Sequence, residues 1–166
     1  MAAAGVLPRL LVLGLTSLAL GCYESATPLN RPQPAPVDAR LVGAWRCVGP
    51  DTSDDAITIT TEGSPNGTYA ITWEESGKKP DHYEGYLAGL QDMTVLNVRE
   101  APASTTSQWS LARIDLLQPD IALIKVVSET LLKGQSAASV RMTLEQQKGN
   151  PALYEKYSLV CIRAKT

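Results

Sequence analysis

The chain has little of what most catalytic, metal-binding and nucleic-acid-binding proteins need. Its 166 residues include one histidine, three cysteines and no phenylalanine. A single histidine leaves no partner for an HxH or HExxH zinc site, and the sequence holds neither a Gly-x-Ser-x-Gly elbow nor a glycine-rich phosphate loop. With 15 Lys and Arg against 17 Asp and Glu, the chain also lacks the basic charge of a nucleic-acid binder. We therefore expect no enzyme, no metal or other cofactor and no nucleic-acid partner.

Long hydrophobic runs are also missing, and the main apolar stretch lies at the N-terminus. Arg9 precedes an apolar run over residues 10–20, which is too short to span a bilayer as a permanent helix. A cationic start, a short apolar centre and small residues after it are typical of a secretory signal. The pattern predicts a signal peptide over residues 1–21.

The end of this segment, Leu18-Ala19-Leu20-Gly21-Cys22, resembles the lipobox of bacterial lipoproteins. The resemblance implies cleavage before Cys22 and a diacylglycerol on its thiol, so that acyl chains such as palmitate anchor an exported protein to a membrane. In a Gram-negative cell we expect the outer membrane, because Tyr23 replaces the Asp that often signals inner-membrane retention. The alternative is an ordinary signal peptide that is cut elsewhere.

A proline-rich stretch follows the cysteine. Residues 22–38 contain Pro28, Pro32, Pro34 and Pro36. Because proline restricts φ and cannot donate a backbone hydrogen bond, this stretch should be extended and unpaired. At about 3.1 Å per residue, such a tether would hold a body roughly 50 Å from the membrane.

The rest of the chain, residues 39–166, reads as one domain made mainly of strands. Ile57 and Ile59 alternate with Thr58 and Thr60, which is a strong β pattern, and similar alternation recurs along the body. The expected strands span residues 41–48, 56–62, 68–75, 82–90, 93–99, 108–117, 121–128 and 153–164. An amphipathic helix is expected over 136–147, before the last strand. The short connections between strands favour antiparallel neighbours, in a closed barrel or a sandwich.

The two remaining cysteines favour the barrel. Cys47 lies on the first strand and Cys161 on the last, and exported proteins meet an oxidising compartment, so we expect a disulfide between them. In an antiparallel register that opposes these cysteines, Trp45 opposes Arg163, and an Arg over a Trp ring is a favourable cation–π pair. Bridge and pair together place the first strand beside the last. Two buried free thiols are the alternative.

The tripeptide Gly43-Ala44-Trp45 resembles the Gly-x-Trp signature on the first strand of the lipocalin and calycin group. That group packs an Arg from late in the chain across this Trp, and Arg163 is the candidate. The resemblance implies an eight-stranded up-and-down barrel. Two features depart from the group, because the helix precedes the last strand and the body is smaller. Small bacterial lipoproteins of unknown function that begin Leu-Val-Gly-x-Trp are the nearest match.

The aromatic side chains are the remaining functional candidates. Tyr69, Trp73 and Tyr83, with Trp109, lie on strand faces and either fill the barrel or line a cavity in it. An eight-stranded barrel has room for its own side chains or for one small ligand. The first hypothesis is an envelope lipoprotein that binds a small apolar or lipid-like molecule beside Tyr69, Trp73 or Tyr83. The second is a filled barrel whose outer face docks onto an envelope partner.

Overall fold

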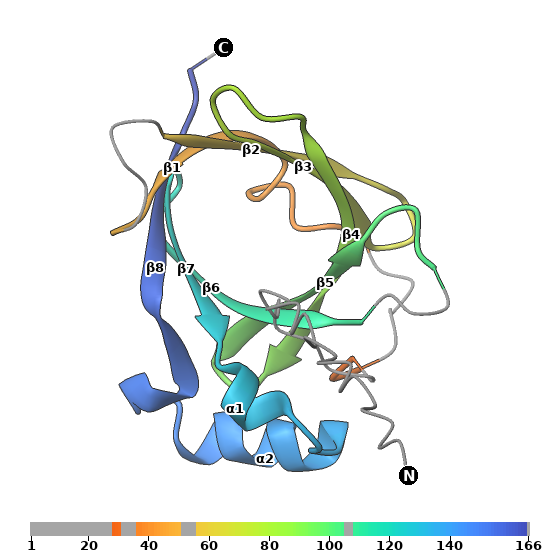
Figure 1. Ribbon diagram of the computed structural model, residues 1–166, viewed down its shortest axis with the longest axis vertical. Helices are drawn as coiled ribbons and strands as arrows, with labels where there is room; N and C mark the ends of the chain where they lie inside the picture. Colours follow the sequence, from red (N-terminus) through yellow and green to blue (C-terminus); the bar gives the residue numbers. More distant parts are fainter. Residues whose placement is uncertain (1–27, 31–35, 51–55, 105–107, 166) are drawn as a thin grey trace, which may run out of the picture.

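The computed structural model describes residues 28–30, 36–50, 56–104 and 108–165. The predicted signal peptide and the predicted lipidation site, Cys22, lie outside these residues. Within them, eight antiparallel strands form a closed barrel in which each strand pairs with its neighbours in the sequence and β8 pairs with β1 (Figure 1). The strands are β1 (Gly43–Val48), β2 (Ile57–Gly63), β3 (Thr68–Glu74), β4 (Asp81–Leu90), β5 (Met93–Glu100), β6 (Ser110–Gln118), β7 (Ile121–Val127) and β8 (Tyr154–Arg163).

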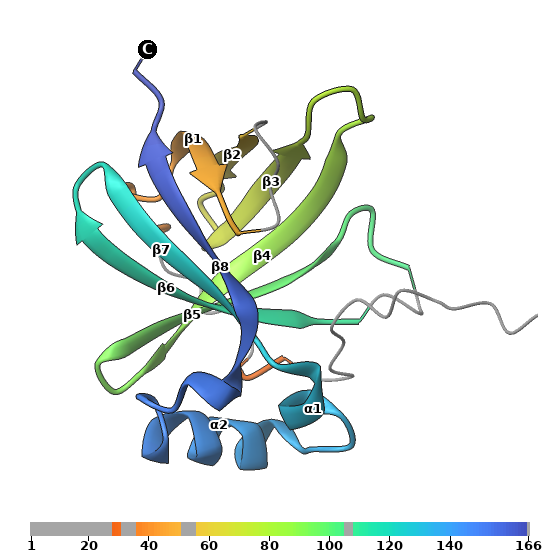
Figure 2. The same cartoon turned by 60° about the vertical axis from the view of Figure 1, so that its left-hand side comes forward.

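The helices follow β7 and lie outside the barrel wall. They are α1 (Glu129–Leu132), α2 (Ala137–Gln146) and the 3-10 turn η1 (Pro151–Leu153). The hydroxyl of Ser136 caps α2 by accepting a hydrogen bond from the amide of Ser139 at 3.2 Å. Figure 2 shows both α-helices alongside the barrel. The predicted mainly β barrel with one amphipathic helix before the last strand is therefore confirmed.

The barrel has two apolar cores because some strands bury both of their faces. The inner core lies inside the ring and includes Trp45, Ile59 and Tyr69. The outer core lies between α2 and the outward face of β4, β5 and β6, where Val140 and Leu144 of the helix belong to one cluster with wall residues such as Val95. Strand alternation places successive side chains on opposite faces, so β4 and β5 carry apolar residues on both faces, as at Leu87-Ala88 and Val95-Leu96.

The first and last strands close the ring in the predicted register. Cys47 lies opposite Cys161 and forms a disulfide with it, and Trp45 lies opposite Arg163. The guanidinium of Arg163 stacks on the Trp45 ring, 4.4 Å from its centroid. Gly43 makes room for this arginine, because a Cβ there would lie 2.9 Å from Nη1 of Arg163. The glycine of the Gly-x-Trp tripeptide therefore has a packing role of its own.

Residues 36–42, called the plug below, cover one end of the barrel. Leu41 is buried in the inner core, and Val37 and Val42 pack against it. The close approach depends on Gly63, where a Cβ would meet Cγ2 of Val37 at 2.3 Å. In Figure 1 the plug, coloured orange, lies across the ring of strands.

Parts of the proline-rich stretch contact the body, contrary to the expectation of an unpaired tether. Leu29 is buried in the outer core, and its amide donates a hydrogen bond to Oδ1 of Asn97 at 2.9 Å. Asp38 belongs to the plug and also bonds to the barrel. Proline content reports only local conformation, so it gave no sign of these long-range contacts.

Candidate ligand-binding site in the barrel

The interior of the barrel is lined mostly by apolar side chains. Every second residue of each strand faces inward, and these inward residues form one cluster with Trp45 and the Cys47–Cys161 disulfide. Besides Trp45 and the two cysteines, the strand residues that form the apolar lining are Ile57, Ile59, Tyr69, Ile71, Trp73, Tyr83, Leu87, Leu96, Val98, Ile114, Leu116, Ala122, Ile124 and Leu159.

Part of this lining is not fully buried. Leu87 lies opposite Leu96 on β4 and β5, and both side chains are only partly buried, as are Val98 and Ile124. These side chains face the inner core and pack against it, and each keeps part of its surface exposed. The lining on β4, β5 and β7 therefore keeps exposed apolar surface that neighbouring side chains do not cover.

Tyr69 faces inward at the plugged end. Its side chain is 2% exposed, and its hydroxyl accepts a hydrogen bond from the amide of Asp38 at 2.7 Å. Burial is the main cause that raises the pKa of this phenol. Tyr69 therefore connects β3 to the plug, and its ring is part of the packed core.

Trp73 and Tyr83 face inward on the adjacent strands β3 and β4, and both are partly buried. The indole N–H of Trp73 donates to Oε1 of Glu75 at 3.0 Å, so its polar atom already has a partner. Hydrogen bonds from Lys78 and then from Trp73 lower the pKa of Glu75, which favours its ionised form. The two aromatic rings thus add apolar surface to the lining next to a charged rim.

Trp109 is the aromatic residue that the structure separates from the other three. It stacks edge to face with Tyr86, with ring centroids 5.4 Å apart, and the Arg99 guanidinium lies 4.5 Å from its ring. Tyr86 and Arg99 occupy the register positions that face outward, so Trp109 belongs to the outer wall. Because it lies beside a loop, the sequence pattern alone did not assign its face.

Potential metal ligands are not clustered in the described residues. Among them, no three His, Cys, Asp or Glu side chains gather in a metal-binding arrangement. His82 is exposed, and its Nδ1 lies 3.4 Å from the Thr72 hydroxyl.

The helices in the described part of the chain lack the length and hydropathy needed to span a bilayer.

Comparison with known proteins adds no relative to this description. The chain matches no family model, no curated protein and no solved structure. What the structure establishes is a closed, eight-stranded, antiparallel barrel with its first and last strands joined, an architecture that is consistent with a lipocalin-like body.

Proposed function

We propose that this protein is a membrane-anchored lipoprotein of the bacterial envelope whose barrel binds one small apolar or lipid-like molecule, without catalysing a reaction. The observation that carries the proposal is the inward-facing apolar surface that stays partly exposed at Leu87, Leu96, Val98 and Ile124. The lipobox-like end at Cys22 supports the anchor.

Exposed apolar surface inside a barrel favours a ligand on energetic grounds. Each square ångström of apolar surface removed from water contributes roughly 25 cal/mol. Leu87, Leu96 and Ile124 offer such surface, and Trp73 and Tyr83 add ring faces. An eight-stranded barrel limits the guest to one small molecule. The ligand class that fits is a compact apolar molecule, which binds by burial and shape with few directed polar contacts.

The test begins with the protein extracted gently from membranes. Native mass spectrometry should find a copurified small molecule, and the neutral fluorescent probe N-phenyl-1-naphthylamine should compete with it. Leu96→Phe should weaken probe binding by filling the interior, and Trp73→Ala should weaken it by about tenfold or more through lost apolar contact. Leu117→Phe is the matched control, because Leu117 is 61% exposed on β6.

The outcome that would remove the binding proposal is specific. If no apolar probe binds the wild type, and Trp73→Ala lowers the melting temperature sharply, the barrel is filled by its own side chains.

A second candidate function is docking through the outer wall, and one surface feature favours it. Val48, Val160 and Ile162 are 52%, 43% and 55% exposed, and Val48 lies opposite Val160 on the neighbouring strand. Contiguous exposed apolar side chains often mark contact surfaces. A second copy of the chain is the simplest occupant, because a two-fold interface pairs one patch with itself. Sedimentation velocity would then detect a dimer that Ile162→Glu dissociates, and a monomeric wild type would contradict this candidate.

A further inference from the structure

The short segment 28–30, called the strap below, is bound to the outer wall of the barrel. The side chain of Leu29 is 7% exposed and belongs to the outer core with α2. Its amide donates to Oδ1 of Asn97, a residue of β5 that is fully buried at 0% exposure. A buried amide side chain loses its hydration, so it needs a partner, and Leu29 supplies one.

Side chains from three elements converge on the strap. The Tyr86 hydroxyl of β4 donates to the carbonyl oxygen of Asn30. Nη2 of Arg141, from α2, donates to Oδ1 of Asn30 at 3.2 Å. Asn97 itself also donates from Nδ2 to the carbonyl oxygen of Tyr86 at 3.4 Å. Leu29 and Asn30 therefore occupy a docking site made by β4, β5 and α2. Without the strap, Oδ1 of the buried Asn97 would lose its hydrogen bond from the Leu29 amide.

The position of the strap shortens the connection to Cys22. Leu29 lies seven positions after Cys22 in the sequence. At no more than about 3.6 Å per step, these seven steps reach at most ~25 Å. A tether that first met the body at the plug would reach about twice as far. The strap therefore decides both how near the body lies to residue 22 and from which wall the chain leaves it.

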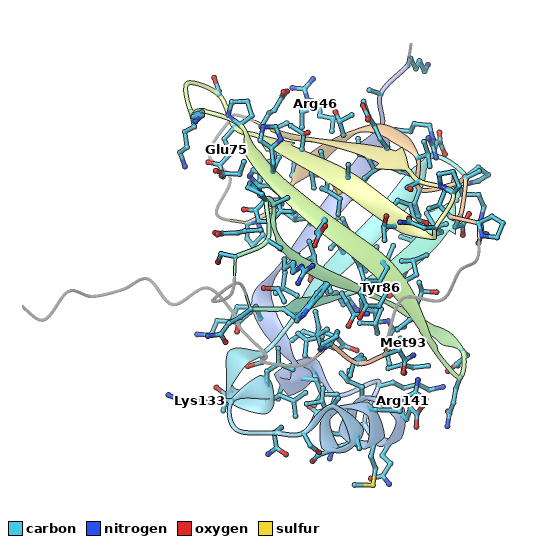
Figure 3. The ribbon with its side chains drawn as sticks, turned by 90° about the vertical axis from the view of Figure 1, so that its right-hand side faces the viewer. Arg46, Glu75, Tyr86, Met93, Lys133 and Arg141 are labelled. Atoms are coloured by element: carbon cyan, nitrogen blue, oxygen red, sulfur yellow. A yellow bond between two sulfur atoms is a disulfide. The ribbon has the colours of Figure 1, made fainter. Side chains whose placement is uncertain are left out.

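We propose that the strap holds the wall formed by β4, β5 and α2 toward the lipid bilayer and turns the β1–β8 wall away from it. This inference rests on the lipid anchor of the proposed function. In the ring order, β8 and β1 lie three or four strands from β4 and β5. The start of β8, at Tyr154, packs on the outer core, whereas β8 pairs with β1 only from Val160 onward, on the far side of the barrel. Figure 3 labels Tyr86, Met93 and Arg141 on the strap side and Arg46 at the opposite end of the view.

One consequence concerns the two surfaces described above. The exposed side chains Val48, Val160 and Ile162 lie on the wall that faces away from the membrane. The strap also binds the side of the barrel, so neither end of the ring is brought directly against the anchor. The bilayer is thus the neighbour of the α2 wall, and the distal wall stays accessible to proteins.

The first test measures the strap without any membrane. Hydrogen exchange of the detergent-solubilised protein should show the Leu29 amide exchanging at least about tenfold slower than in an unstructured peptide. Asn97→Ala should remove that protection, whereas Asn66→Ala, in the exposed β2–β3 turn, should not. Exchange of Leu29 at the unstructured rate in the wild type would overturn the docked strap.

The second test measures orientation on vesicles that contain an acceptor dye on the lipid headgroup. A donor dye on Met142→Cys, in α2, should transfer energy more efficiently than one on Arg46→Cys, in β1. Leu29→Asp should reduce the difference by releasing the strap. Equal transfer from the two sites in the wild type would overturn the proposed orientation.

The two tests separate failure of the anchor from failure of the strap. If the wild type does not bind vesicles, the lipid anchor and the orientation both fall, whereas the exchange result still decides whether the strap is docked. If it binds vesicles and Leu29 is protected, but the two dyes report equal transfer, the strap is docked and does not orient the body.

Discussion

At the scale of single residues, Arg163 connects the last strand of the barrel to its first strand and to the plug. Its side chain stacks on Trp45 and donates hydrogen bonds to the carbonyl oxygen of Val42, at 2.6 Å, and to that of Arg40. Those carbonyls belong to the plug, so one residue of β8 contacts both β1 and the segment that covers the barrel end. The planar guanidinium suits this role because it stacks and donates at the same time.

Arg163→Ala should therefore destabilise the protein. Loss of the cation–π contact and of donors to two carbonyl oxygens should lower the free energy of unfolding by about 2–3 kcal/mol. Arg163→Lys should restore only part of this, because an ammonium cannot stack and fork in the same way. Urea denaturation checks both values against Arg46→Ala, an exposed neighbour on β1 that should change little. Equal losses for Arg46→Ala and Arg163→Ala would contradict the role.

The buried phenol of Tyr86 predicts that the stability of the protein falls at alkaline pH. Burial raises the pKa of Tyr86 to about 12, above the ordinary value of 10.0. The folded state thus holds the phenol proton more tightly than the unfolded state. The resulting stability is complete below pH 10 and is lost as the pH rises from 10 toward about 12, since the unfolded state then ionises first.

Tyr86→Phe should flatten this alkaline loss, because it removes the titrating group. The measurement is the urea midpoint of the wild type and the variant at several pH values between 9 and 12. Tyr69→Phe is a useful comparison, because burial also raises the pKa of Tyr69. Parallel pH profiles for wild type and Tyr86→Phe would show that Tyr86 does not contribute.

At the scale of secondary-structure elements, the Cys47–Cys161 disulfide joins the first and last strands. The two residues are separated by 114 positions in the sequence and lie opposite each other in the β1–β8 ladder. A crosslink over so long a loop restricts the unfolded chain strongly. Because β1 is only six residues long, the bridge adds to the stability of one of the shorter ladders in the barrel.

The double variant Cys47→Ala, Cys161→Ala should lose about 2–5 kcal/mol of unfolding free energy. The residues are buried at 0% and 1% exposure, so the loss includes the packing contacts of the two sulfur atoms as well as the crosslink. Thermal unfolding with and without reductant provides the check, and reductant should affect only the wild type. Peptide mapping of the purified protein that finds both thiols free would contradict the bridge.

At the scale of the whole molecule, the proposed lipid anchor at Cys22 predicts that the protein is bound to a membrane. Cys22→Ala should release the protein from the membrane fraction, because acyl chains supply the attachment. Cell fractionation followed by a salt wash measures this, and Cys47→Ala with Cys161→Ala serves as the control that keeps Cys22. A cleaved Cys22→Ala protein that stays with the membrane would contradict the lipoprotein hypothesis.

The whole barrel also explains why inward aromatic residues have different roles. Tyr69 and Trp73 share the inner face of β3, yet Tyr69 meets the plug and is fully packed, whereas Trp73 keeps exposed surface. The difference comes from the plug, which covers only one end of the ring. Of the sequence candidates for ligand contact, Trp73 and Tyr83 therefore remain the more suitable probes.

The sequence by itself determined the strands, the helix and the closing register. Alternation such as that of Ile57 and Ile59 is a local property, and it indicates a strand wherever only one face of that strand is buried. The opposed pairs of Cys47 with Cys161 and of Trp45 with Arg163 carried long-range information, because a disulfide and a cation–π pair each require a specific partner.

Only the tertiary structure decided where Leu29, Trp109 and the plug lie. Leu29 is 68 residues from Asn97, and no local pattern in a proline-rich stretch indicates that contact. The outer core of β4 and β5 depends on α2 packing against the wall, which hides a second strand face and makes alternation ambiguous there. Contacts of this kind arise from surfaces that only the assembled barrel creates, so their energy is distributed over distant residues that no short window of sequence contains.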